Sequence, residues 1–93
     1  MKSFPALKDP DEVKDFGVVW NLLLTGETIT DSEWFVDQGS VVLGQSEVIN
    51  NVTIVWVSGG VGGEECLVRN RITTSNLPPR IYERTGKLNV QEL

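Results

Sequence analysis

The chain has 93 residues, one cysteine, no histidine and a net charge of −5 from 13 acidic and 8 basic side chains. This length predicts a single domain over residues 1–93, and the acidic excess argues against nucleic acid as the main partner, because phosphate binding needs a basic surface. One cysteine excludes an internal disulfide and a thiolate zinc site, and the lack of histidine removes the commonest general base and metal ligand.

The first fourteen residues predict an extended arm or edge element. Pro10 biases Asp9 away from helical backbone angles, and the mixture of aspartate and proline in the run from Lys8 to Lys14 favours turns. We therefore expect this arm to lead into the first full strand of the domain.

The segment from Asp15 to Leu22 predicts that strand, because apolar and other residues alternate along it. The expected apolar face contains Phe16, Val18, Trp20 and Leu22. A helix is the alternative, since some apolar residues also recur at helical spacing. Gly17 inside the segment and its content of β-branched and aromatic residues favour the strand.

The middle of the chain predicts several short strands separated by turns. Thr28–Thr30 is expected as a short strand or a loop, and Ser32–Asp37 as a strand with Trp34 and Val36 facing inward. A further short strand is expected at residues 41–43, and residues 46–49 could continue its pairing.

The segment from Thr53 to Ser75 predicts two strands joined by a glycine-rich turn, which is typical of a hairpin. After the turn, Cys66 shares the apolar face with Val68 and Ile72, so it is expected to be a buried small side chain rather than a reactive thiol. The glycine string has neither the Gly-Lys-Ser/Thr ending nor the following helix of a phosphate loop. It is interpreted as a flexible turn and a possible contact tip.

The last strands are expected at Ile81–Arg84 and Leu88–Val90, with an interruption at Gly86. Short strands at intervals of roughly 8–12 residues predict an all-β fold. We expect an immunoglobulin-like antiparallel β-sandwich of about seven short strands, with Trp20, Trp34 and Trp56 in its core.

Charged residues supply two groups of candidate contacts, and no residue is a candidate for a catalytic, cofactor-binding or metal-binding role. The acidic group near Asp9 does not fit the spacing of a calcium loop, and interleaved lysines indicate a solvated surface. The arginines at 69, 71, 80 and 84 either pair with Glu64, Glu65 or Glu83 across the sheet or form a patch for a protein partner. The candidate partner-contact residues are Asp9, Asp11, Glu12, Gly59, Gly60, Val61, Gly62, Gly63, Arg69 and Arg71.

Several segments in a fixed order resemble a family of small proteins from tailed bacteriophages, the fiber-tail adaptor proteins. The segments that carry the resemblance are Lys8-Asp9-Pro10, Trp20, Gly26-Glu27-Thr28-Ile29, Ser32 with Trp34, Trp56 to Gly60 and Asn70-Arg71-Ile72-Thr73-Thr74. The resemblance covers roughly residues 8–90. It implies an immunoglobulin-like sandwich that acts as a non-enzymatic part of the virion and joins the fibers to the tail.

The expected partners are therefore other virion proteins, namely tail fibers and tail adaptor, nozzle or portal-proximal proteins, with multiple copies of the chain per particle. The chain has no leader and no apolar run approaching the ~18 residues of a membrane span, so no membrane partner is expected. Assembly is expected in the host bacterial cytoplasm, without cofactors. The alternatives are a capsid decoration protein and, more distantly, a carbohydrate-binding module with sugars stacked on tryptophan.

Overall fold

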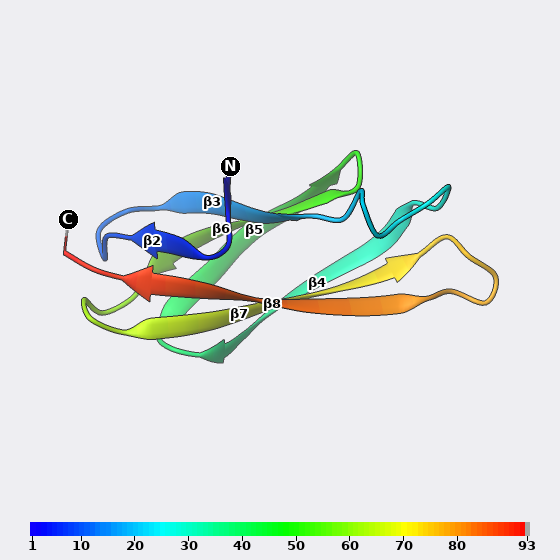
Figure 1. Cartoon of the computed structure of the whole chain (residues 1–93). Coiled ribbons are helices and arrows are strands. Elements are labelled where there is room, and N and C mark those ends of the chain that lie inside the picture. Colours follow the sequence, from blue (N-terminus) through cyan, green and yellow to red (C-terminus); the bar gives the residue numbers. More distant parts are fainter. Residues whose placement is uncertain (93) are drawn as a thin grey trace.

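Two four-stranded β-sheets pack face to face in the computed structural model, which describes residues 1–92 (Figure 1). Sheet A has the order β1 (Lys2–Ser3), β3 (Lys14–Val19), β6 (Val52–Gly59) and β5 (Val41–Ile49). Sheet B has the order β2 (Ala6–Lys8), β8 (Ile81–Val90), β7 (Glu65–Thr74) and β4 (Ile29–Gln38). The predicted all-β sandwich is confirmed, with eight strands in an elongated body of 45 × 21 × 20 Å.

The glycine-rich segment crosses from one sheet to the other, so the predicted hairpin between β6 and β7 is wrong. Strand β6 pairs with β3 and β5 in sheet A, whereas β7 pairs with β4 and β8 in sheet B. Both strands are central in their sheets. Apolar alternation indicates which side chains are buried, but it does not indicate which strands are neighbours.

The N-terminal arm also switches sheets. Its first strand, β1, runs parallel to β3 in sheet A, and its second, β2, runs parallel to β8 in sheet B. Between them, the Phe4 ring packs on Phe16, with 5.6 Å between ring centroids, and covers Gly86 so closely that any side chain there would overlap it. The predicted interruption of the last strand at Gly86 is therefore wrong: β8 is continuous, and its glycine makes room for Phe4.

Two strands have different limits from those predicted. Strand β3 ends at Val19, because the amides of Leu23 and Leu24 both turn back to the carbonyl of Trp20. Leu22, expected on the apolar face, is consequently 99% exposed. The two segments expected at residues 28–37 form one strand, β4, whose register shifts near both ends.

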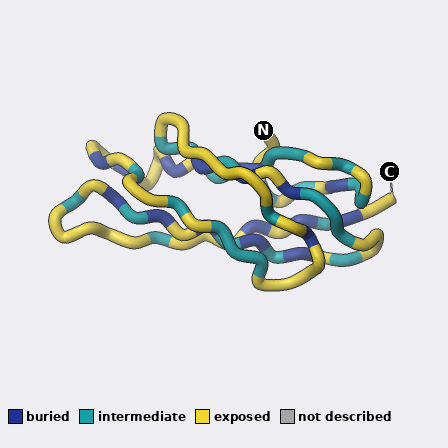
Figure 2. The backbone as a smooth tube through the Cα atoms, turned by 180° about the vertical axis from the view of Figure 1, so that it is seen from behind, coloured by how far each residue is buried: buried dark blue, intermediate teal, exposed yellow. Residues whose placement is uncertain are grey.

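The core lies between the sheets, where buried positions alternate with exposed ones along the strands (Figure 2). Cys66 is fully buried with Val68 and Ile72, as predicted. Trp20 is fully buried, and Trp34 is partly buried against the core. The placement of Trp56 in the core was wrong: it is 40% exposed on the outer face of sheet A, because Thr53, Val55 and Val57 occupy the inward positions of β6.

Candidate interaction surfaces

One end of the sandwich, here called the loop end, brings together two groups of predicted contact residues. The turn Asp9–Glu12 joins β2 to β3, and the glycine loop Gly59–Gly63 joins β6 to β7 (Figure 1, left). Fully buried Lys8 connects them, since its ammonium donates to the carbonyl of Gly59 at 2.6 Å and to that of Asp9 at 2.9 Å. The loop end is thus one ordered surface built from distant parts of the chain.

The acidic turn uses most of its carboxylates internally. The Asp9 amide donates to Glu12 Oε1 at 2.8 Å, and the Asp11 amide donates to Asp9 Oδ1 at 2.9 Å. Lys14 pairs with Glu12 at 2.7 Å and lowers the pKa of that carboxyl group. Asp11 is exposed, and within residues 1–92 no cation pairs with its carboxylate. Asp11 is therefore the acid of this turn that is best placed to meet a partner.

The conformation of the glycine loop depends on glycine at three positions and on the Glu64 carboxylate. Gly59, Gly60 and Gly63 have φ values of 72°, 98° and 91°, which favour glycine over other residues. The Glu64 carboxylate closes the loop by accepting hydrogen bonds from the Ser40 hydroxyl at 2.6 Å and the Val61 amide at 2.9 Å. Val61 stands at the tip with 62% of its surface exposed, so the loop presents an apolar contact.

The hydrogen bonds to Glu64 predict a pH dependence of the loop. The Ser40 hydroxyl and then the Val61 amide lower the pKa of Glu64, so this carboxylate stabilises the folded loop above its unfolded pKa of about 4.3. The stabilisation is lost as the pH falls through the lower, folded pKa. In an NMR titration from pH 6 to pH 2, we expect the amide signals of Ser40 and Val61 to move together with a midpoint below about 4.3.

The Glu64→Gln variant provides the control for this titration, because its neutral amide cannot titrate. Its Ser40 and Val61 signals should show no shared transition over the same range. A wild-type midpoint at or above that of an ordinary glutamate would contradict the proposed role of Glu64.

Of the predicted arginine patch, Arg69 and Arg71 lie along β7 on the outer face of sheet B, and they differ. The inclusion of Arg84 was wrong, because it pairs with buried Asn70 and therefore lies on the opposite face. Arg69 is engaged by Asp37 at 2.9 Å and by Glu83, and its guanidinium lies over the Phe35 ring at 4.3 Å. These carboxylates raise the pKa of Arg69. Arg71 is exposed and forms no ion pair with residues 1–92.

The outer face of sheet A is a surface that the sequence analysis missed. Large apolar side chains lie on three adjacent strands of this face, and most of them are exposed. This apolar face consists of Val19, Val42, Ile49, Ile54 and Trp56. The signal was present in β6, where apolar residues occupy both phases of the strand. Because only one face of the strand is covered by a second sheet, the other apolar phase, with Ile54 and Trp56, lies on the outer face.

A family model described as "Podophage GP4 fiber-tail adaptor protein gp77" matches residues 8–89. The chain belongs to this family. The match extends from Lys8 in β2 to Asn89 in β8, and therefore includes both the acidic turn and the glycine loop. The resemblance read from the sequence is confirmed. Membership in the adaptor family indicates a phage structural protein, a virion component that interacts with other virion proteins.

Among curated proteins, no sequence matches that of this family member. Within its described residues, no helix is long and apolar enough to cross a membrane. Residues 1–92 also contain no group of three or more histidine, cysteine, aspartate or glutamate side chains placed to hold a metal ion.

Proposed function

We propose that the protein is a non-enzymatic part of the tail of a bacteriophage that joins tail fibers to the tail through protein–protein contacts. The observation that carries this proposal is the adaptor-family match over residues 8–89. The fibers would bind on one side, and a tail adaptor, nozzle or portal-proximal protein on the other. Several copies per particle, assembled in the host cytoplasm, would let weak individual contacts hold firmly.

The geometry supports a protein that contacts two partners at once. The loop end and the apolar face differ in character and meet where Val42 lies beside Gly59. One has an exposed acid and a glycine loop, and the other has exposed aliphatic side chains and Trp56. Within residues 1–92, strands β4 and β5 are each paired on one side, which leaves their outer backbone edges able to accept a strand from another protein. We assign partner contacts to Asp9, Asp11, Glu12, Gly59–Gly63 and Arg71, and a structural role to Arg69.

The proposal predicts the appearance of particles assembled without the protein. We expect such particles to have filled heads and tails that lack fibers, because the connecting component is missing. Electron microscopy of particles from a deletion phage, with and without complementation by the wild-type chain, measures this directly.

A tagged copy of the chain distinguishes the proposed position from a place on the capsid. Density or label at the junction of tail and fibers supports the adaptor role. Label on the capsomers, or fibers that remain attached in the deletion phage, would overturn it and favour a capsid decoration protein.

A further inference from the structure

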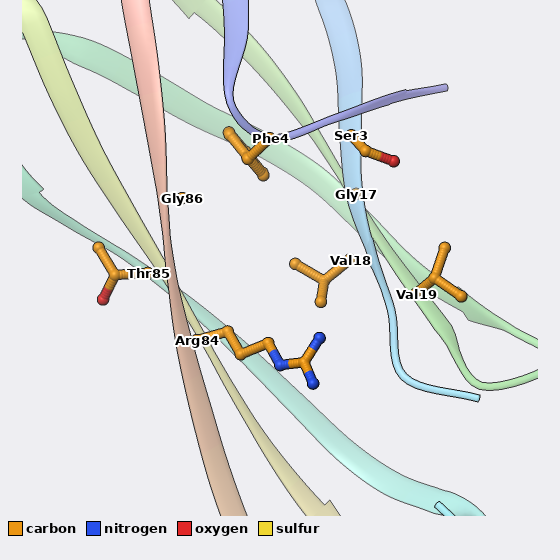
Figure 3. A pocket seen from close by; sticks show the side chains of 8 residues that line it. All are labelled: Ser3, Phe4, Gly17, Val18, Val19, Arg84, Thr85 and Gly86. Carbon is orange, nitrogen blue, oxygen red and sulfur yellow. The ribbon is translucent and has the colours of Figure 1, made fainter. Parts of the chain in front are cut away.

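A groove opens between the sheets at the edge where β3 faces β8. It contains a hollow of about 270 Å³ whose wall is formed by Val18 and Val19 of β3, by Phe4 of the arm, and by Arg84 and Gly86 of β8 (Figure 3). A second hollow, of about 330 Å³, continues along β8 on the other side of Phe4. The surface is mostly apolar and contains one guanidinium group.

The backbone next to this groove is unpaired on its outer side. Strand β2 pairs with β8 over Leu88–Val90, so within residues 1–92 no strand pairs with the outer edge of β8 from Ile81 to Thr85. Strand β1 likewise pairs with β3 only at Phe16 and Gly17. Free strand edges hydrogen-bond readily to an extended segment of another chain.

Arg84 supplies the charge of the groove. It pairs with inward-facing Asn70 in the register of β7 and β8, and its guanidinium lies over the Trp20 ring at 4.8 Å. It is exposed, and no carboxylate within residues 1–92 forms an ion pair with it, although the chain has an excess of acids. Arg69, on the other face of the same sheet, has two carboxylate partners. A planar guanidinium of this kind binds a carboxylate with both of its parallel N–H groups.

We propose that this groove binds an extended segment of a partner virion protein that carries a carboxylate two residues from an apolar side chain. The segment adds to the free edge of β8. Because side chains alternate along a strand, residues i and i+2 point to the same face. One therefore pairs with Arg84 while the other packs on Phe4 and Val18. This inference rests on the proposed function, which supplies the partner protein.

A defined peptide tests the groove in solution. The probe is a blocked heptapeptide of alternating valine and threonine with one aspartate in place of a central valine, added to the ¹⁵N-labelled full chain. We expect amide shifts at Ile81–Thr85 and at Val18, and a shift of the Trp20 indole signal. The Arg84→Gln variant should bind the peptide at least about tenfold more weakly, as should wild type with an asparagine peptide.

The Arg69→Gln variant is the matched control, since Arg69 lies on the opposite face of sheet B, has no assigned partner contact and should leave the affinity unchanged. Absence of binding, equal binding by the Arg84→Gln variant, or shifts confined to β4 and β5 would overturn the proposal. So would a concentration-dependent dimer that the Arg84→Gln variant abolishes, because a second copy would then occupy the groove.

Particle assembly separates failure of this inference from failure of the adaptor role. In the deletion phage, we expect the Arg84→Gln chain to give particles without fibers and the Arg69→Gln chain to restore the fibers. Fully fibered particles with the Arg84→Gln chain would show that the groove does not bind the partner segment as proposed, and they would leave the adaptor role intact. A label that is absent from the tail in all complemented particles would refute the adaptor role itself.

Discussion

Replacing Asn70 with alanine is expected to lower the free energy of unfolding by about 3–5 kcal/mol. The side chain is fully buried between the sheets, and its Oδ1 accepts hydrogen bonds from the Trp20 indole at 3.0 Å and from the Thr53 hydroxyl. Its Nδ2 donates to Ser32 Oγ at 3.0 Å and to the carbonyl of Glu33 at 2.9 Å. One amide thus connects β4, β6 and the residue that follows β3.

The loss is large because alanine leaves several buried polar groups without a partner in a region of low dielectric constant. A domain of this size has a total stability of only about 5–14 kcal/mol, so the variant should be close to unfolded at 37 °C. Urea unfolding followed by circular dichroism measures the difference.

Arg71→Ala is the control for this experiment, because it changes the next, exposed residue of the same strand. We expect its effect to stay within about 0.5 kcal/mol. If Asn70→Ala lowered the free energy of unfolding by less than about 1 kcal/mol, water would have replaced the amide, and the network would not connect the sheets.

Replacing Lys8 with methionine is expected to destabilise the fold by about 2–3 kcal/mol and to loosen the glycine loop specifically. Methionine retains much of the buried volume, but it removes the charged donor from the carbonyls of Gly59, Asp9 and Pro10. Hydrogen bonds that involve a charged group contribute more than neutral ones, and the freed carbonyls stay partly buried.

Hydrogen exchange measures the local part of this effect, with faster exchange expected at the amides of residues 60–63. Lys14→Met is the matched control, because Lys14 forms only a partly exposed ion pair with Glu12 and should cost no more than about 1 kcal/mol. Unchanged exchange in the glycine loop of the Lys8→Met variant would show that the loop holds its conformation without the ammonium group.

Much of the fold could be predicted from local patterns, because alternation along a strand reports which side chains are buried. This is why the position of Cys66 was predicted correctly. Alternation does not report which strands are neighbours, so the two strands flanking the glycine loop were wrongly paired with each other. The outward position of Trp56 was missed for a related reason, since both phases of β6 are apolar.

The candidate site was predictable in part. Glycine and acidic residues marked the two segments of the loop end, but nothing local indicated that they meet. Their connection depends on Lys8, a residue type that is almost never fully buried without partners, and its main acceptor lies 51 residues away in the chain. The role of Gly86 could not be predicted locally either, because the Phe4 ring that occupies the space beside it comes from the other end of the sequence.

The sheet-switching arm has a consequence for how the chain folds during synthesis. Ala6 pairs with Leu88, so a segment from the start of this domain meets its neighbouring strand only after nearly the whole domain has been made. Joining such distant segments carries a high cost in loop-closure entropy, and folds dominated by pairings of this kind form in milliseconds to seconds. The arm therefore pairs with β8 late in translation, and the native topology is complete only then.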